Sequence, residues 1–349
     1  MVKHITIHIT KTCNLNCEFC HVAARCGEKD TNKIDMRILR NLFAPTVESI
    51  SIAGGEPFFV KDKLYDLLNQ IPENVKSVGI TTNGLLLEDE DIQILKKKNV
   101  RLQFSMDGTP PDHEANRGKN TFSKSLENMK KAIAAGIRTD VLTTVSKDNM
   151  HHMDEYIKSV DDLGIENIML LHFTPKGRGA YMPELEVPQL EWMRFCMEFG
   201  KNCGAKKTRV WIQPRFMMKS SVQRMDKARM VQLCNCHRFE YAYVDIDDGM
   251  VYPCGLAYNT PLGIGSLKDE TLQELVQCAL AKDQVPKECK NCESVEVCQG
   301  GAKCYAWLVK KDICAKDPYC SGGNIIPICP FPAEYIAGPK MRTKIPTIV

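Results

Sequence analysis

The sequence lacks three features that would each point to a particular class of protein. No apolar run reaches the roughly 20 residues that a membrane-spanning helix needs. The formal net charge is only +3, too small to predict nucleic-acid binding from bulk electrostatics. Met1 leads into an apolar stretch without the charged and then apolar leader of a secreted protein. We therefore expect a cytoplasmic protein that binds neither membranes nor nucleic acids.

Cysteine is absent from residues 27–195, although the chain holds 17 cysteines. They fall into three groups: four before Asp30, the pair Cys196 and Cys203, and eleven between Cys234 and Cys329. Disulfides do not explain them in the cytosol, which keeps thiols reduced. Metal or cluster binding is the usual alternative. The distribution predicts two metal-bearing ends around a metal-free middle.

The most specific cysteine pattern follows the apolar run 5–9. Cys13, Cys17 and Cys20 are separated by three and by two residues. Three thiols can hold three irons of a [4Fe–4S] cube, and since full ligation takes four cysteines, one iron stays open for another molecule. A structural zinc site, which usually has four protein ligands, and free buried cysteines are the alternatives.

Six β-rich runs alternate with six amphipathic helical stretches over residues 4–205. The strands are expected at 4–10, 48–52, 76–82, 101–105, 138–145 and 166–173, and the helices at 35–44, 62–71, 88–98, 122–135, 152–163 and 188–203. This repetition predicts an α/β fold with a parallel sheet, either doubly wound or a barrel. Six units are too few for the eight of a complete barrel, so we expect a partial TIM-like barrel.

Polar residues and glycines follow several of these strands, at the ends where parallel α/β folds bind ligands. The candidate binding residues are Gly54, Gly55, Glu56 and Pro57 after the second strand, Asn83 after the third, Ser105 and Asp107 after the fourth, and Arg117 beyond it. Each segment is also compatible with an ordinary turn or loop. After the sixth strand, Arg178 can either meet a substrate carboxylate or shape its loop.

The cysteine triplet and these segments together resemble the radical S-adenosylmethionine (radical SAM) family. The resemblance implies a (β/α)6 partial barrel in which Cys13, Cys17 and Cys20 hold a [4Fe–4S] cluster whose open iron chelates SAM. It implies that the segment 54–57 binds the SAM amino group. Asn83, Ser105, Asp107 and Arg117 would line the SAM pocket. Reductive cleavage of SAM would then release a 5′-deoxyadenosyl radical.

The C-terminal cysteines resemble the SPASM extension of the same family, which holds two auxiliary [4Fe–4S] clusters. By that resemblance the first would be ligated by Cys234, Cys236, Cys254 and Cys304, and the second by Cys289, Cys292, Cys298 and Cys320. Two zinc sites are the alternative. The remaining cysteines are expected to be small buried hydrophobes.

One departure from the SPASM pattern affects the first auxiliary site. The pattern expects a cysteine four positions after Cys298, where Ala302 stands. Either Cys304 reaches the cluster from a shifted position, or that cluster keeps an open iron. The expected domains are 1–205, the radical SAM barrel; 206–233, a basic linker; 234–330, the SPASM domain; and 331–349, a tail.

The resemblance implies an oxygen-sensitive oxidoreductase or maturase that removes a hydrogen atom from a peptide or protein side chain. Auxiliary clusters would take up electrons or anchor the substrate, and a ferredoxin- or flavodoxin-type protein would supply low-potential electrons. A tetrapyrrole, as in alternative haem synthesis, is the second substrate class, and the loop 177–179 favours it. A non-catalytic iron–sulfur electron carrier or scaffold is the third hypothesis, and it leaves the segments 54–57 and 105–108 unexplained.

Overall fold

The computed structural model describes residues 1–27, 30, 32–213, 215–218, 234–320, 322 and 325–327. Most of the basic segment expected as a linker, 219–233, and the expected tail, 331–349, lie outside these residues. The domain boundaries therefore stay a prediction. No described helix has the length and apolar character needed to pass through a membrane.

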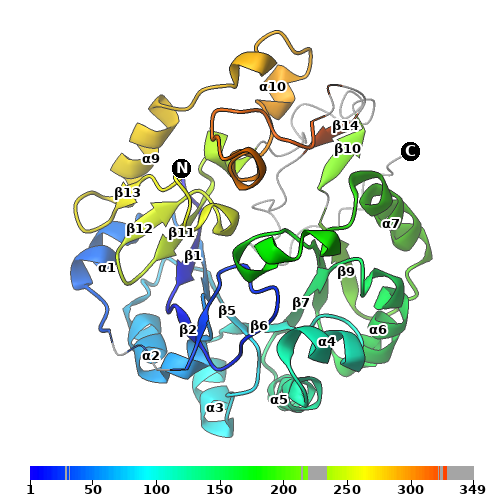
Figure 1. The fold of residues 1–349 in the computed structure, drawn as a ribbon. Coiled ribbons are helices and arrows are strands. Elements are labelled where there is room, and N and C mark those ends of the chain that lie inside the picture. Colours follow the sequence, from blue (N-terminus) through cyan, green and yellow to red (C-terminus); the bar gives the residue numbers. More distant parts are fainter. Residues whose placement is uncertain are drawn as a thin grey trace.

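A single ten-stranded sheet forms the framework of the fold (Figure 1). Its strands, in spatial order, are β13 (Gly265–Ser266), β12 (Met250–Tyr252), β11 (Tyr241–Asp245), β1 (His4–His8), β4 (Ser49–Ala53), β5 (Ser77–Thr82), β6 (Arg101–Ser105), β7 (Thr139–Val145), β8 (Asn167–His172) and β9 (Arg209–Ile212). From β11 to β9 all neighbours are parallel, whereas β12 and β13 are antiparallel additions. Each of the six predicted strands is present, and the predicted partial barrel is confirmed.

Helices surround the curved sheet on its outer side (Figure 1). They are α1 (Met36–Leu42), α2 (Lys61–Gln70), α3 (Asp89–Lys97), α4 (Pro110–Arg117), α5 (Thr121–Ala134), α6 (Met153–Val160) and α7 (Gln189–Asn202). The cysteine-rich part adds α9 (Leu272–Ala281), α10 (Val295–Cys298) and α11 (Lys303–Tyr305). Helix α4 was not expected from the sequence. Two prolines in its first turn and a capping box between Thr109 and Asp112 start it.

Strict alternation along the strands separates the core from the inside of the barrel. Ile5 and Ile7 of β1 are fully buried among the apolar residues that pack with the helices. Thr6 between them faces the opposite side of the sheet, where it lines a cavity together with Ser51 of β4 and Thr81 of β5. On β1, β4 and β5 the barrel thus presents hydroxyl groups to the cavity, whereas on β7, β8 and β9 it presents Leu142, Met169 and Trp211.

The sheet extends beyond the six predicted units at both edges. Strand β9 lies within the segment expected as a linker and pairs with β8. Strand β11, in the cysteine-rich part, pairs with β1 over five residues, from His4 opposite Tyr241 to His8 opposite Asp245. The cysteine-rich part is thus joined to the barrel through a continuous hydrogen-bonded sheet.

Because β11 and β1 share one sheet, a cavity made behind β11 should destabilise the barrel as well. Ile246 is only 1% exposed and belongs to the main apolar core. We expect Ile246→Ala to lower the free energy of unfolding by about 2–5 kcal/mol. Urea unfolding followed by circular dichroism measures this, with the 66% exposed Leu190, changed to Ala, as the control. Two separate unfolding transitions, of which only one shifted to lower urea concentration in Ile246→Ala, would contradict the shared sheet.

Candidate active site

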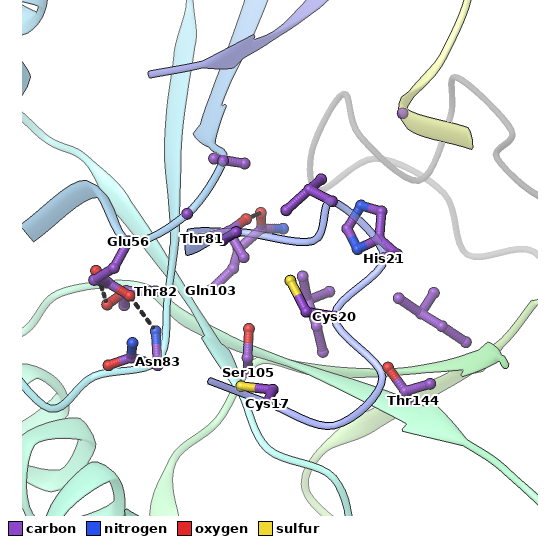
Figure 2. A pocket seen from close by; sticks show the side chains of 18 of the residues that line it. Cys17, Cys20, His21, Glu56, Thr81, Thr82, Asn83, Gln103, Ser105 and Thr144 are labelled. Carbon is purple, nitrogen blue, oxygen red and sulfur yellow. Dashed lines mark hydrogen bonds between the residues drawn. The ribbon is translucent and has the colours of Figure 1, made fainter. Parts of the chain in front are cut away.

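A cavity of about 330 Å³ opens among the carboxyl ends of the parallel strands, a volume in the range of ligand pockets. Its wall combines the inward side chains of the barrel strands with the loop that carries Cys13, Cys17 and Cys20 (Figure 2). Tyr241 and Tyr243 of β11 complete the wall on the side of the cysteine-rich part. The cavity is therefore bounded by the barrel, the N-terminal thiols and the C-terminal part together.

The loop of the three thiols is closed by a two-residue parallel pairing of β2 (Thr12–Cys13) with β3 (Arg25–Cys26). Within it, the Leu15 backbone N–H donates to Cys13 Sγ at 3.4 Å. All three cysteines line the cavity, Cys13 being 7% exposed and the other two partly buried. Burial raises the pKa of the Cys13 thiol to about 12, and the nearby Glu56 carboxylate adds to that effect.

Arg178 holds this loop in shape. Its Nε donates to the Cys17 carbonyl at 2.7 Å and its Nη1 donates to the Ala24 carbonyl at 2.6 Å. Its backbone N–H donates to the Cys20 carbonyl at 3.0 Å. Of the two roles that the sequence left open for Arg178, the structure supports the shaping of the loop.

Gly177 allows that contact to form. Its φ is +60°, and a Cβ added there would lie 2.3 Å from the Cys20 carbonyl oxygen. Only glycine tolerates both the left-handed conformation and such a close backbone approach. The loop after β8 therefore packs directly on the thiol loop.

The glycine pair after β4 serves a similar purpose. A Cβ on Gly55 would lie 1.8 Å from the Thr12 carbonyl oxygen, and one on Gly54, whose φ is +129°, would lie 2.8 Å from that of Thr10. The backbone N–H of Gly55 donates to the Thr10 carbonyl at 2.7 Å. Both glycines line the cavity, and their close approach fixes the backbone that leads to Cys13.

Glu56 lies in the cavity wall with most of its acceptor capacity in use. Its carboxylate accepts from Thr82 Oγ1 at 2.7 Å, from the Asn83 backbone N–H at 2.8 Å and from the Phe58 backbone N–H at 3.1 Å (Figure 2). An ionised carboxylate accepts about four hydrogen bonds, which leaves room for roughly one further donor. Burial raises the pKa of Glu56 to about 7, although these hydrogen bonds oppose the shift. Pro57 starts the 3-10 helix Pro57–Val60 and is not among the cavity-lining residues described.

Asn83 ties the end of β5 to the thiol loop. Its Nδ2 donates to Asn14 Oδ1 at 2.8 Å and lies 3.9 Å from Cys13 Sγ. Ser105, at the end of β6, lines the same cavity with its side chain directed inward (Figure 2). Both predicted residues thus lie beside the thiols.

Asp107 is fully buried and is not among the cavity-lining residues described. It accepts from Arg117 Nε and from Asn116 Nδ2, both at 2.7 Å, and from the Thr144 backbone N–H at 3.0 Å. Burial opposes its ionisation, but the Arg117 guanidinium outweighs burial and holds the pKa of Asp107 below its usual value. Arg117 in turn lines the cavity, where it interacts electrostatically with Cys17 and Cys20.

Residues 7–160 match a protein-family model described as the Radical SAM superfamily. This part of the chain is a radical SAM domain. A radical SAM domain sets aside the hypothesis of a non-catalytic electron carrier or scaffold.

The radical SAM enzyme is similar to named proteins over most of its length. It is 25% identical over 360 residues to the AdoMet-dependent heme synthase of Nitratidesulfovibrio vulgaris, covering 91% of this chain and 92% of that protein. It is 22% identical over 331 residues to the cysteine-type anaerobic sulfatase-maturating enzyme of Clostridium novyi, covering 84% and 86%. A solved structure of Streptococcus suis SuiB bound to its precursor peptide SuiA matches with a TM-score of 0.69 over 91% of this chain and 75% of that chain, at 17% identity.

The superfamily uses a [4Fe–4S] cluster and SAM, and the residues of this radical SAM enzyme fit both. Three thiols from one loop line a single ligand-sized cavity, and the Arg117 guanidinium in the same wall places a positive charge near Cys17 and Cys20, where anionic cluster ligands would need one. Among the described residues, no three His, Cys, Asp or Glu side chains converge as a single-ion site requires.

Interactions among the C-terminal thiols run within the two predicted sets, whose role as cluster ligands stays a prediction. Cys234, Cys236, Cys254 and Cys304 belong to one buried cluster. The Cys304 thiol interacts with that of Cys254 by a hydrogen bond and with Cys234 electrostatically. In the other set, Cys320 interacts with both Cys289 and Cys298, and Cys292 interacts with Cys289.

The cysteines outside these sets are less buried than expected. Cys26, Cys278 and Cys314 are exposed, and Cys196 and Cys203 are partly buried. The expectation of small buried hydrophobes is wrong for the three exposed cysteines. Cys329 lies outside the described residues.

Sequence reasoning missed several residues that position the thiol loop. Asn116 accepts from the Phe19 backbone N–H with its Oδ1 at 3.2 Å and from the Glu18 backbone N–H with its carbonyl at 3.0 Å. Asn14 receives the hydrogen bond from Asn83. Asn14 follows Cys13 and Asn116 precedes Arg117, and this proximity to predicted site residues is the one sequence signal that could have identified them.

Replacing Gly177 should disturb the thiol loop without affecting the rest of the barrel. We expect Gly177→Ala to lose about four irons per chain after anaerobic reconstitution, because its Cβ would collide with the Cys20 carbonyl. The matched control is Gly136→Ala, where φ is +84° but no atom lies within 4 Å of the added Cβ. Equal iron content in both variants would contradict the role of this contact.

The raised pKa of Glu56 predicts a pH-dependent contribution to stability. Between its usual value of 4.5 and about 7, the folded state holds a proton that the unfolded chain has released, so the contribution of Glu56 falls as the pH rises through that window. We expect the stability of the wild-type apo protein relative to Glu56→Gln to decrease between pH 5 and pH 8. Thermal unfolding at both pH values measures this, with the exposed Glu73, changed to Gln, as the control. A constant difference would contradict the shift.

Proposed function

We propose that this radical SAM enzyme oxidises or crosslinks a side chain of a peptide or protein. One observation carries the proposal: a single cavity is lined both by the three-thiol loop and by Tyr241, Tyr243 and Gly255 of the cysteine-rich part. A substrate in that cavity would contact both parts of the molecule. The relative from Clostridium novyi is named a sulfatase-maturating enzyme, and SuiB was solved with a precursor peptide, which supports the choice of substrate class.

The charges of the described cavity favour a peptide over a tetrapyrrole. A tetrapyrrole brings several carboxylates, which require basic partners. The basic side chains in the described lining are His21, Arg117 and Arg178. Arg117 is paired with Asp107 and would be engaged by SAM, and Arg178 donates to the Cys17 and Ala24 carbonyls. His21, an exposed residue of the thiol loop, is the one basic side chain left in the described lining. The loop 177–179, which favoured the tetrapyrrole in the sequence, is thus engaged with the thiol loop.

Cys13, Cys17 and Cys20 would hold the SAM-binding cluster, and Glu56 would receive the SAM ammonium with its remaining acceptor capacity. When bound, the cluster and SAM supply a 5′-deoxyadenosyl radical that abstracts a hydrogen atom. The protein orients the substrate and excludes water from this chemistry. Arg117 would contact the SAM carboxylate or sugar, held in place by Asp107.

The two C-terminal thiol sets would hold auxiliary clusters that take up electrons or anchor the substrate. Cys304 is 2% exposed and contacts Cys254 despite the Ala302 departure. This supports ligation of the first auxiliary cluster from the shifted position rather than an open iron there. A low-potential donor of the ferredoxin or flavodoxin type would deliver electrons. The proposal places the protein in the cytosol. The 16 described cysteines are all free, as expected in that reducing compartment.

The source of the abstracted hydrogen tests the proposal. The reconstituted enzyme is incubated with SAM, dithionite and a pool of perdeuterated peptides, and 5′-deoxyadenosine is analysed by mass spectrometry. We expect deuterium in 5′-deoxyadenosine with the peptides, and no 5′-deoxyadenosine from Cys17→Ala. Stimulation by a tetracarboxylate tetrapyrrole, with no deuterium from peptides, would contradict the proposal.

A further inference from the structure

A buried lysine connects the two thiol-bearing parts of the molecule. Lys176 follows β8 and is only 6% exposed. Its Nζ donates to the His21 carbonyl and to the Gly255 carbonyl, each at 3.3 Å. His21 directly follows Cys20, and Gly255 directly follows Cys254. One ammonium group thus joins the loop of the SAM-site thiols to a loop of the first auxiliary set.

The positive charge of Lys176 is not balanced by a carboxylate among the described residues. In the described part of the chain, no carboxylate forms an ion pair with its Nζ, which lies 5.5 Å from the centre of the Tyr258 ring. Burial lowers the pKa of Lys176 to about 8, and the groups that oppose this shift are the thiols of Cys254, Cys304 and Cys20, in that order. A buried cation is costly unless a negative charge compensates it.

Cluster binding would create that negative charge. Cysteines ligate iron–sulfur clusters as thiolates, so the three thiols that interact electrostatically with Lys176 become anionic when their sites are loaded. Two of them, Cys254 and Cys304, belong to the first auxiliary set, and Cys20 belongs to the SAM-binding set. Lys176 therefore joins loops of two predicted cluster sites through the His21 and Gly255 carbonyls, and it belongs to neither cysteine motif.

We propose that Lys176 is a charge partner shared by the SAM-binding cluster and the first auxiliary cluster, and that it raises the reduction potential of both. Reduction adds negative charge to a cluster, and a fixed cation nearby stabilises the reduced form more than the oxidised form. Lys176 is a positioning residue in this account because it acts through the clusters. The inference rests on the proposed function, in which these thiols ligate clusters.

The size of the effect should differ among the three sites. The first auxiliary site presents two thiols to Lys176 and the SAM-binding site presents one, so the auxiliary potential should respond more strongly. Among the described groups named as acting on Lys176, none is a thiol of the second auxiliary set. That set is an internal control within every sample.

Redox titration of the fully reconstituted chain, followed by EPR without substrate, tests the inference. The signal that changes on addition of SAM identifies the SAM-binding cluster. We expect Lys176→Met to lower the potential of the first auxiliary cluster by about 59 mV or more, a tenfold change in the one-electron equilibrium. The SAM-binding cluster should shift less in the same direction, and the third should not shift. Lys176→Arg keeps the charge and should keep the wild-type potentials.

Lys63→Met is the matched control for the loss of a buried lysine. Lys63 is 7% exposed, like Lys176, but it pairs with Asp30 and Asp247 rather than with thiols. This variant should leave all three potentials unchanged. Full iron content with unshifted potentials in Lys176→Met would overturn the inference, as would an equal shift in Lys63→Met.

Loss of iron from Lys176→Met would also be informative. Iron retained in Lys176→Arg but lost from both Lys176→Met and Lys176→Gln would support charge compensation, whereas loss from all three would indicate packing and overturn it. The wild-type protein separates this inference from the proposed function. Absence of SAM cleavage by a loaded wild type would remove the function, whereas normal cleavage with unshifted potentials in Lys176→Met would remove only the inference.

Discussion

The parallel pairing of β1 with β4 on one side and β11 on the other determines where the chemistry of this molecule takes place. Strand β1 leads to Cys13, β4 leads to the pair Gly54 and Gly55, and β11 leads through a hairpin to Cys254. The first two segments thus leave neighbouring strands at the same end of the sheet, whereas antiparallel β12 returns past Tyr243 before the chain reaches Cys254. The loops of the SAM-site thiols and of the first auxiliary thiols are joined through Lys176, which donates to the carbonyls of His21 and Gly255.

Backbone contacts then fix the thiol loop from several directions. The glycines after β4 approach the backbone that precedes Cys13, and Gly177 and Arg178 approach the backbone around Cys17 and Cys20. These contacts involve backbone atoms of the loop, and all three cysteines line the cavity. A loop held through its carbonyl groups can keep its shape whether or not its thiols are ligated, which preorganises it for a cofactor.

The sequence predicted the elements whose signals are local, and missed those that depend on tertiary contacts. The alternation of strands and helices and the cysteine spacings identified the partial barrel and the three thiol sets. Strand β9 was missed because four residues within a basic segment give little periodicity. The roles of Arg178 and Lys176 depend on carbonyl groups about 80 to 160 positions away in the chain, which no local pattern records. Glycines 54 and 55 were predicted as ligand contacts, which stays a prediction, and the sequence did not reveal that their small size also serves the packing of backbone on backbone.

The central claim is that thiols from separate segments form three independent cluster sites, and iron counting tests it most directly. Iron and sulfide per chain are measured after anaerobic reconstitution of the wild type and of three variants, each with one thiol set changed to alanine. The account predicts about 12 irons in the wild type and about 8 in each variant, since each site holds a cube of four. A wild type with about 8 irons, unchanged by loss of the set that includes Cys254 and Cys304, would contradict the first auxiliary site. Zinc in place of iron would contradict the whole account.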